Sequence, residues 1–386
     1  MVILNITTLI PSPCSPRENN ILLVTAQQHE SRKDSIKHVF VRLLPYTPTI
    51  LTRVSDKWKC YKKLAEAKGY SWDNRYIHVL ALVSFKKDVW IRPFTNWLSY
   101  AIHKKRLMQL VLDNKVNIIH AHSIYTEGYL ARRLSKDLNI PYVITTRGIQ
   151  RFSLKPQARL NVLKAKSVIS INNIHKSLAD SILKNRKSHL MPHGIDDMFL
   201  LMNRKAGFSV PQIVTICRLL TMKNIERVFY ALEKTKADFV YHIYGDGPDL
   251  LRLQDVLSGL SIKNKVKFMG FLPYENVPET LSNYDIFVMT SYPETLGRVY
   301  FEAMAVGLPV VGARNTGIDG YIQQGVSGYV VQHTDIDELH VVIDALLKDK
   351  ILREEIGRRA KDMMVANYSW SSVIEKLHSI YKDIDS

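Results

Sequence analysis

Two glutamates stand in a mostly apolar stretch, residues 291–311, which reads SYPETLGRVYFEAMAVGLPVV. The preceding run DIFVMTS has the pattern of a buried strand, and RVYFEAMAV has that of a helix. PETLG is then the loop between them, with Glu294 in the loop and with Gly297 and Arg298 at the helix start, where free N–H groups favour an anion such as phosphate. Glu302 lies about one turn inside the apolar helix, where a carboxylate is costly unless something donates hydrogen bonds to it.

The spacing leaves two interpretations of these carboxylates open. In the functional one, each carboxylate accepts hydrogen bonds from a sugar or ribose at one end of a ligand whose phosphates lie at the helix start. In the structural one, Glu294 complements the helix dipole and Glu302 pairs with a neighbouring arginine.

A second loop carries two cations. In TICRLLTMKN a strand ends near Cys217, and Arg218 and Lys223 follow before a helix begins. A planar guanidinium and a point-charge ammonium beside a helix start suit a diphosphate, although an ordinary solvated loop has the same composition. The turn IYGDGPDL places Gly245 where backbone could approach a ligand closely, which is a weak signal by itself.

The first half of the chain offers histidines and an arginine. VNIIHAHS ends a strand with His120 and His122, whose separation of two puts both on one face. TTRG ends the next strand with Arg147, which we expect to reach the same cleft. A hydrogen-bonded structural histidine is an equally good interpretation of each histidine alone.

The elements that must position these residues alternate between strands and helices. The runs are apolar on both faces, as in parallel strands covered by helices on both sides, and the alternation predicts doubly wound sheets. The expected strands cover 2–8, 38–44, 76–84, 116–122, 141–146, 167–172 and 188–193, then 211–217, 239–245, 266–271, 285–291, 309–313 and 328–331. Ligands of such sheets bind at the carboxyl ends of strands.

Charge divides the chain into halves. Residues 1–200 hold 32 Lys and Arg against 13 Asp and Glu, whereas residues 201–386 hold 21 against 23. This split predicts two domains with different partners. The three cysteines, Cys14, Cys60 and Cys217, have neither metal spacing nor a disulfide framework, which fits a reducing cytosol. The sequence contains no apolar run of 18 residues, so we expect no membrane span. Its start has no clear signal-peptide layout.

Taken together in order and spacing, these pieces resemble the family 4 retaining glycosyltransferases of the bacterial surface-polysaccharide type. PETLGRVYFEAMAVGLPVV matches the E-x7-E motif and the A-M-A-x-G-x-P-V-V run of that family. CRLLTMKN matches G-R-L-x-x-x-K-G, with Cys217 and Asn224 in place of its glycines. IYGDGP, VKFMGFLP, IIHAHS and MPHGID also fit, so the resemblance covers nearly the whole chain.

The resemblance implies an α/β GT-B fold, in which two Rossmann-like doubly wound domains face a central cleft. We expect an acceptor-binding domain over 1–197 and a nucleotide-sugar domain over 208–369, with the amphipathic helix 370–386 packing back on the first. The resemblance also implies a nucleotide-diphosphate sugar as the substrate, with neither a cofactor nor a metal expected. The D-x-D tripeptides at 335–337 and 383–385 are therefore interpreted as chance.

The same resemblance assigns roles to the candidate residues. Arg218 and Lys223 would hold the donor diphosphate, Glu302 the ribose and Glu294 the transferred sugar. Catalysis is assigned to Glu294 and His122, and Arg147 lines the acceptor side. The other expected donor-binding residues are Gly245, Thr295, Leu296, Gly297 and Arg298. Retention would follow from front-side attack, with the leaving phosphate accepting the proton of the acceptor hydroxyl.

The sequence departs from the family pattern at two places. ARNTGIDGYI has Gly320 where the family often has the Glu of G-G-x-x-E. The loop PSPCSPRENN at 11–20 lacks the Gly-Gly pair that often follows the first strand, which bears on the contacts to the acceptor.

The remaining expectations concern the partners, the location and the alternative functions of the protein. We expect a lipid-linked glycan acceptor and a cytoplasmic enzyme that is peripheral on the inner face of the plasma membrane, docked on anionic lipid through its basic first half. Basic residues interleave with aromatic ones in three runs, 57–63, 86–92 and 97–106. The residues chosen to test this docking are Lys62, Lys63, Lys104 and Lys105. The alternatives are a nucleotide-sugar 2-epimerase of the same fold, an inactive sugar-binding homologue and a basic nucleic-acid-binding protein. No recognised nucleic-acid module is present, so no nucleic-acid partner is expected.

Overall fold

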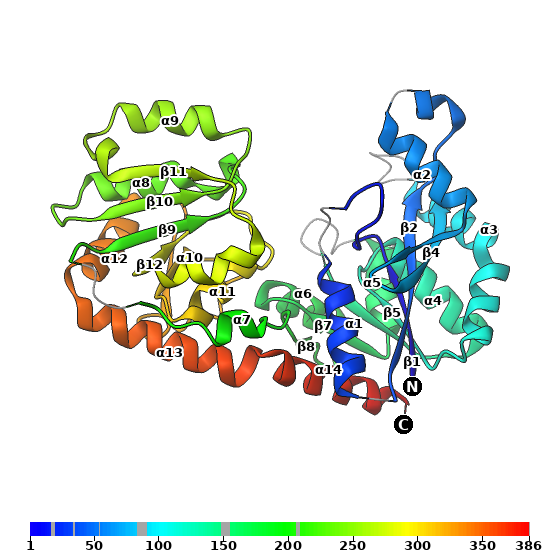
Figure 1. Ribbon diagram of the computed structural model, residues 1–386. Coiled ribbons are helices and arrows are strands. Elements are labelled where there is room, and N and C mark those ends of the chain that lie inside the picture. The colour runs from blue at the N-terminus through cyan, green and yellow to red at the C-terminus, as the bar shows by residue number, and fades with distance from the viewer. Residues whose placement is uncertain are drawn as a thin grey trace. The chain divides into compact units, whose positions relative to one another are not determined.

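The computed structural model describes residues 1–16, 20–33, 35–53, 55–82, 91–147, 155–205 and 209–385, without the side chains of residues 50 and 52. The chain divides into two compact units (Figure 1). Unit 1 comprises Met1–Ile171, His175–Met191 and Ile374–Ser386, and unit 2 comprises Asn172–Ile174 and Pro192–Val373. No helix of the described residues is long and apolar enough to cross a membrane.

Unit 1 contains an eight-stranded sheet in the order β3-β4-β2-β1-β5-β6-β7-β8, parallel except for the β3–β4 pair. Its strands are β1 (Val2–Thr7), β2 (Lys37–Pro45), β3 (Gly69–Trp72), β4 (Arg75–Leu82), β5 (Ile118–Ala121), β6 (Tyr142–Thr146), β7 (Ser167–Ser170) and β8 (His189–Leu190). Its helices are α1 (Ile21–Arg32), the 3-10 helix η1 (Thr49–Arg53), α2 (Asp56–Glu66), α3 (Arg92–Asp113), α4 (Thr126–Leu138), α5 (Pro156–Lys164) and α6 (Asn173–Leu183), which begins within unit 2.

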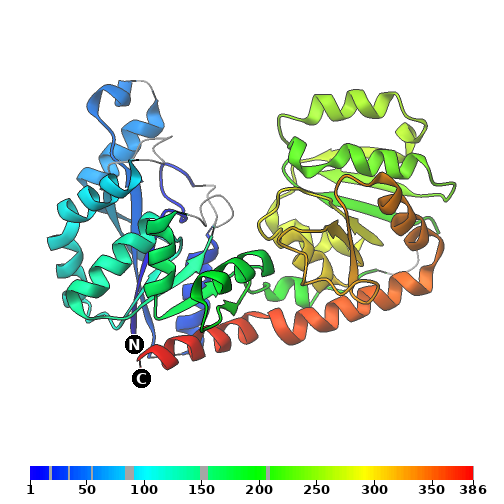
Figure 2. The same cartoon turned by 180° about the vertical axis from the view of Figure 1, so that it is seen from behind.

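Unit 2 contains a six-stranded parallel sheet in the order β11-β10-β9-β12-β13-β14. Its strands are β9 (Gln212–Ile216), β10 (Val240–Tyr244), β11 (Val266–Gly270), β12 (Ile286–Val288), β13 (Val310–Ala313) and β14 (Gly328–Val331). Its helices are α7 (Asp197–Leu200), η3 (Thr221–Lys223), α8 (Ile225–Glu233), α9 (Leu250–Ser258), η4 (Ser261–Lys265), η5 (Tyr274–Asn276), α10 (Val277–Ser282), α11 (Arg298–Val306), α12 (Ile336–Lys348) and α13 (Lys350–Tyr368). Viewed from behind, α13 runs along one side of this unit (Figure 2).

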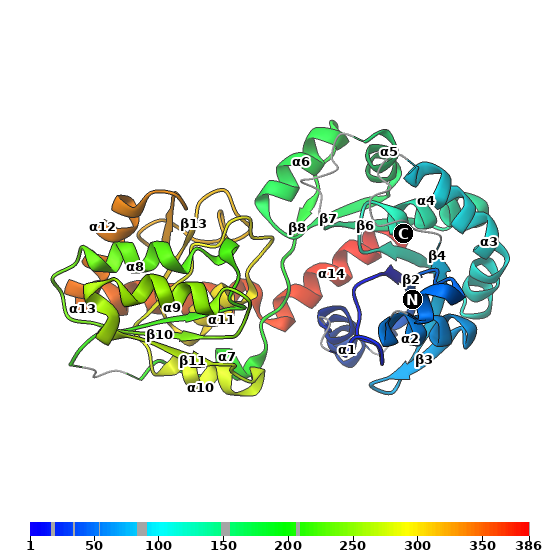
Figure 3. The ribbon, with the colours of Figure 1, turned by 90° about the horizontal axis from the view of Figure 1, so that it is seen from above.

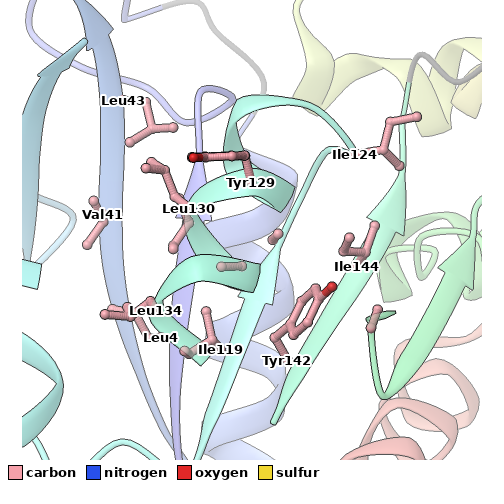
Figure 4. Packing of buried hydrophobic residues seen from close by; sticks show 14 of the residues in the cluster. Leu4, Val41, Leu43, Ile119, Ile124, Tyr129, Leu130, Leu134, Tyr142 and Ile144 are labelled. Carbon is pink, nitrogen blue, oxygen red and sulfur yellow. The ribbon is translucent and has the colours of Figure 1, made fainter. Parts of the chain in front are cut away.

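The last helix, α14 (Trp370–Asp385), contributes to both units, because unit 1 takes it from Ile374 onward. In unit 1 it lies beside α1, as two views at right angles show (Figures 1 and 3). The apolar cluster of unit 1 fills the space between the sheet and α4 (Figure 4), and its members include Leu4, Val41, Ile119, Leu130 and Ile144. The central strands β1, β2, β5, β6 and β7 are almost wholly buried on both faces. Together with the parallel sheet of unit 2, they confirm the predicted pair of Rossmann-like sheets.

The sequence pattern missed β3. It pairs with β4 through a two-residue turn at Asp73 and Asn74, both with positive φ, at 49° and 58°. Asp and Asn tolerate this left-handed conformation, and two such residues are the signature of a tight hairpin. The sequence WDNR therefore indicated a hairpin between two short β-rich runs.

The expectation of unpaired cysteines is wrong for two of the three. Cys14, in the loop after β1, forms a disulfide with Cys60 of α2, and their Cα atoms are 5.7 Å apart. The two residues are 46 positions apart in the sequence, so no spacing rule could reveal the pair before the fold brought them together. The cysteine content is therefore no longer an argument for a reducing compartment.

Candidate functional site

The strand order of unit 2 reverses between β9 and β12, which are neighbours in the sheet. β9 leads to β10 on one side, and β12 leads to β13 on the other. Loops leaving two such strands diverge and leave a crevice at their carboxyl ends, which is where doubly wound sheets bind ligands. Lys223 follows β9 and Glu294 follows β12, so the topology brings together two residues that the sequence had assigned to separate motifs.

Lys223 and Glu294 form an ion pair, with Nζ 2.6 Å from Oε2 and each side chain 15% exposed. Glu294 also accepts hydrogen bonds from the Ser291 hydroxyl at 3.2 Å and from the Thr295 N–H at 3.0 Å. The carboxylate is thus held by three donors in the loop that leads into α11. A cation and a carboxylate therefore lie side by side at the switch point.

Helix α11 begins directly after Gly297, whose φ of 69° lies in the left-handed region. A Cβ at this position would meet the ring of Tyr300 at 2.5 Å. A side chain here would therefore be both strained and obstructed. The loop can turn sharply into α11 only with glycine at this position. The free N–H groups at the start of α11 therefore come only a few residues after Glu294 in the sequence.

Glu302 is 7% exposed, and burial raises its pKa. The guanidinium of Arg298 lies 3.6 Å away, and the Tyr274 hydroxyl lies 3.2 Å away. The arginine pairing of the structural interpretation is thus present. Glu302 and Arg298 also line a small pocket with Asp196, His193, Gly194, Ile195, Leu296 and Phe301.

Tyr274 was not singled out from the sequence. Its hydroxyl lies 2.8 Å from Asp196 Oδ2 and accepts a hydrogen bond from Arg298 at 2.9 Å. The carboxylates of Asp196 and Glu302 and the guanidinium of Arg298 therefore converge on the Tyr274 hydroxyl. The signal was the motif VKFMGFLP, which ends directly before Tyr274 and was quoted without the residue that follows it.

The loop after β9 shows why two family glycines can be absent. Asn224 adopts a positive φ of 55°, which asparagine tolerates, and its amide donates to the Thr290 carbonyl at 2.7 Å. Cys217 is not among the residues with positive φ, so its backbone does not need glycine. Arg218 is exposed, and it has no ion-pair partner among the described residues.

Gly245 has a packing role. A Cβ there would lie 1.8 Å from the Cys217 carbonyl oxygen, and the Gly245 N–H donates to the Gly270 carbonyl at 2.7 Å. The turn after β10 therefore packs directly against the loop that carries Arg218. Gly245 shapes that loop whether or not it also approaches a ligand.

The other expected donor-side residues belong to the same packed loop. The Thr295 carbonyl accepts a hydrogen bond from the Asn172 amide at 2.5 Å, and Leu296 is 6% exposed. Gly320, which replaces the family Glu, has a φ of 87°, and a Cβ there would lie 1.8 Å from the amide nitrogen of Asn173. The asparagine amide occupies the space that a side chain at position 320 would need.

His122 and Arg147 belong to unit 1, where they follow the adjacent strands β5 and β6. His122 is 6% exposed, and its Nε2 lies 3.0 Å from Asn5 Oδ1. Burial lowers the pKa of Arg147 to about 10, with Glu127 acting in the opposite direction. Both residues stand at the carboxyl edge of the sheet, as their positions predicted.

Among the described residues, no group of three or more His, Cys, Asp and Glu side chains could hold a metal ion. Asp335 of the first D-x-D tripeptide caps α12, because its side chain accepts the Glu338 N–H at 2.9 Å. Asp337 pairs with Lys234 on the surface. That tripeptide therefore has a structural explanation.

Comparisons with known proteins agree with this architecture. Residues 205–363 match the family described as glycosyl transferases group 1, and residues 67–180 match the family described as glycosyl transferase 4-like. N-acetyl-alpha-D-glucosaminyl L-malate synthase of Bacillus anthracis is 25% identical over 303 residues, which are 72% of this chain and 78% of that protein. A GDP-mannose-dependent alpha-(1-6)-phosphatidylinositol monomannoside mannosyltransferase of Mycolicibacterium smegmatis is 33% identical over 170 residues, 42% of this chain and 44% of that protein.

Solved structures show the same fold. A glycosyltransferase from Rickettsia africae has a TM-score of 0.71 at 19% identity, covering 99% of this chain and 98% of its own. The Anabaena protein HepE, solved with UDP and glucose, has a TM-score of 0.66 at 16% identity, covering 99% of this chain and all of its own. From these two family matches and the two parallel sheets, we conclude that the chain is a group 1 glycosyltransferase with the GT-B fold.

Proposed function

We propose that this glycosyltransferase moves a sugar, with retention, from a nucleotide-diphosphate sugar to a hydroxyl of a lipid-linked glycan in surface-polysaccharide synthesis. The observation that carries the donor half of this proposal is the Lys223–Glu294 pair at the switch point, directly before α11. The leaving group is a diphosphate, whose developing charge needs fixed cations and amide dipoles. Lys223, Arg218 and the start of α11 supply these groups.

Glu294 accepts hydroxyls of the transferred sugar in this scheme, and Glu302 accepts the ribose. The Tyr274 hydroxyl lies 3.2 Å from Glu302, so a ribose diol would replace or join this polar neighbour. His122 and Arg147 serve the acceptor side from unit 1. Front-side attack needs no enzymatic nucleophile, and the leaving phosphate takes the proton of the acceptor hydroxyl.

The acceptor half of the proposal rests on charge and exposed apolar surface. On α3, Phe94 is 61% exposed and Trp97 is 52% exposed, and their rings lie 5.8 Å apart. Lys105 of the same helix is exposed, whereas Lys104 pairs with Asp137 at 2.7 Å. Aromatic residues beside cations favour the surface of an anionic membrane, where a lipid-linked acceptor resides.

Two parts of the docking surface expected from the sequence differ from the rest. Lys62 lies 3.8 Å from Glu66, so its charge is partly offset. The run containing Lys86, Lys87 and Trp90 lies outside the described residues. We therefore centre the proposed docking surface on Lys63, Phe94, Trp97 and Lys105, at the inner face of the plasma membrane.

A donor screen tests the proposal. The protein is incubated with radiolabelled UDP-, GDP- and dTDP-sugars and a lipid extract, and label is followed into the lipid phase. HepE was solved with UDP and glucose, so UDP-glucose is the first donor to try. Label in lipid with the donor's anomeric configuration is expected. A sugar nucleotide changed at C2 would indicate the 2-epimerase, binding without turnover would indicate an inactive homologue, and RNA or DNA binding without sugar binding would indicate the nucleic-acid binder.

A further inference from the structure

Five buried residues of unit 1 form one hydrogen-bonded chain. It runs from His122, after β5, to Asn5 on β1, His38 on β2, His29 on α1 and His378 on α14, and every member is at most 8% exposed. The links measure 3.0 Å from His122 Nε2 to Asn5 Oδ1 and 3.0 Å from Asn5 Nδ2 to His38 Nδ1. They continue at 3.1 Å from His38 Nε2 to His29 Nδ1 and at 3.1 Å from His29 Nε2 to His378 Nδ1.

The orientation of one amide sets the direction of this chain. Asn5 Nδ2 lies 3.3 Å from the carbonyl oxygens of both Ile3 and Val39. Carbonyl oxygens only accept hydrogen bonds, so the amide atom that faces them is the nitrogen. Asn5 Oδ1 must then face His122, and the amide cannot flip without setting its oxygen against two other oxygens.

Every proton position in the chain follows from that orientation. Asn5 Nδ2 donates to His38 Nδ1, so the proton of neutral His38 is on Nε2 and is donated to His29. His29 in turn donates from Nε2 to His378 Nδ1. In the other direction, Asn5 Oδ1 accepts the proton on His122 Nε2, so Nδ1 is a hydrogen-bond acceptor in the neutral form of His122.

The surroundings favour the neutral imidazoles of His29, His38 and His378, whose pKa values are all lowered by burial. Burial lowers the pKa of His29 to about 4 and lowers that of His38 well below its usual range, and neighbouring imidazoles act in the same direction. Lys33, Lys382, Glu375 and the chain's N-terminal ammonium face the His378 end. Arg75, which pairs with Glu30, faces His38, and the Glu30 carboxylate accepts the His38 backbone N–H.

A second contact fixes the ring plane of His122. His120 stacks on it with ring centroids 4.1 Å apart. His120 is itself held by Tyr381 Oη at 2.6 Å and Thr145 Oγ1 at 2.8 Å. The ring of His122 is thus constrained in its plane by stacking and along its edge by Asn5.

We propose that Asn5 is a positioning residue, which fixes His122 in the tautomer that carries its proton on Nε2 and keeps Nδ1 as a hydrogen-bond acceptor. The chain of histidines from Asn5 to His378 holds Asn5 itself in place, so α14 takes part in the arrangement at β5. The tautomers follow from the geometry of unit 1 alone. Only the use of this tautomer in the transfer reaction rests on the function proposed above.

Nitrogen NMR of the whole protein with ¹⁵N-labelled histidine tests the tautomers directly at neutral pH. His29, His38, His122 and His378 should all show the pattern of a proton on Nε2, with each signal assigned by its own His→Gln variant. Two histidines calibrate the patterns within the same sample. His175 Nδ1 faces the Thr146 carbonyl at 2.7 Å and must carry its proton there, and His103 Nε2 faces the Ala81 carbonyl at 2.7 Å and must carry its proton on Nε2.

The variant Asn5→Asp gives the sharper test, because a carboxylate only accepts hydrogen bonds. His38 must then donate from Nδ1, and His29 and His378 must follow, while His122 continues to donate from Nε2. A switch of these three signals, with His103 and His175 unchanged, supports the chain. Signals of His38 and His29 that keep the proton on Nε2 in Asn5→Asp, or that show it on Nδ1 in the wild type, overturn it.

Transfer assays then separate the positioning role from a structural one. Asn5→Leu should lower kcat about 10- to 100-fold, as loss of a partner that orients a functional imidazole does, with the donor KM little changed. In Asn5→Asp the acid limb of the kcat profile should move to higher pH, since a carboxylate favours the charged imidazole. Switched tautomers with an unchanged kcat and pH profile would remove His122 from the reaction. Absence of transfer in the wild type would refute the proposed function and leave the NMR result standing.

Discussion

Lys223 and Glu294 neutralise each other across the switch point of unit 2, with 2.6 Å between Nζ and Oε2. In the proposed reaction Lys223 turns to phosphate and Glu294 to the sugar, so the bound donor replaces one ion pair with two ligand contacts. Each partner therefore restrains the other before the donor binds. Variants of the two residues should consequently have opposite effects on binding of the product.

Replacing Glu294 with Gln should lower kcat about 30- to 1,000-fold, which corresponds to loss of one charge-assisted contact in the transition state. The nucleoside diphosphate, which lacks the sugar, should bind as well as to wild type or more tightly, because Lys223 is released from its partner. Transfer assays and calorimetry measure the two effects. Glu302→Gln is the matched control, and it should weaken nucleoside and nucleoside diphosphate alike. Activity of Glu294→Gln within threefold of wild type would exclude Glu294 from the mechanism.

Arg218→Ala and Lys223→Ala should each weaken nucleoside diphosphate binding about 10- to 100-fold, as expected for a hydrogen bond to a charged group. Binding of the bare nucleoside should change less than threefold, since both cations are assigned to the phosphates. Calorimetry with the two ligands gives the comparison. An equal loss for both ligands would contradict the assignment of these cations.

Gly320→Ala should destabilise unit 2 by about 1–3 kcal/mol, because the position combines a positive φ with an overlap on the Asn173 amide. Gly325→Ala provides the control, since its φ of 71° is similar and no heavy atom lies within 4 Å of the added Cβ. The difference between the two variants in urea unfolding isolates the overlap. Equal stabilities would mean that Asn173 moves aside freely and that the family Glu could be accommodated there.

Acid should destabilise unit 1 before it affects any charge pair on the surface. Burial lowers the pKa of His29 to about 4 and that of His120 to about 3, so the unfolded chain binds more protons than the folded one below about pH 6.5. Stability is then complete above pH 6.5 and falls toward pH 4, by about 1.4 kcal/mol per pH unit for each such histidine. Urea unfolding followed by tryptophan fluorescence reports mainly on unit 1, which holds every tryptophan except Trp370. A midpoint that is constant between pH 7 and pH 5 would contradict this prediction.

The proposed docking surface predicts that liposomes with anionic lipid sediment the protein, and that added salt releases it. Lys105→Ser and Trp97→Ser should each weaken this binding several-fold. The adjacent Lys104→Ser is the matched control with little effect, because Asp137 already offsets its charge. Equal recovery on neutral and anionic liposomes at low salt would refute the docking proposal.

The strand pattern and the motifs were accessible from the sequence because they depend on local chemistry. Apolar runs predicted the strands, and the strand and helix patterns on either side of PETLG placed Gly297 at the start of α11. The missing information was non-local. The pairing of Lys223 with Glu294 depends on β9 and β12 being neighbours, and the Cys14–Cys60 disulfide depends on a loop meeting α2.

Other residues had no distinctive signal. Asn5 is one polar residue in an apolar strand, and only its four contacts in the folded chain reveal how it orients His122. Tyr274 lies in a loop whose conformation no periodicity predicts. The glycine at 320 was visible, but the reason for it is Asn173, nearly 150 positions earlier in the sequence.

The division of α14 between the units has a consequence for biosynthesis. Trp370 packs against Gly194 and donates to Asp196 at 2.7 Å in unit 2, and His378 and Tyr381 complete the histidine cluster of unit 1. Unit 1 therefore begins first on the ribosome and is completed last, after all of unit 2 has been translated. During that interval His29 and His120 lack their partners from α14. The nascent unit 1 therefore stays incomplete until a segment roughly two hundred residues later has been translated.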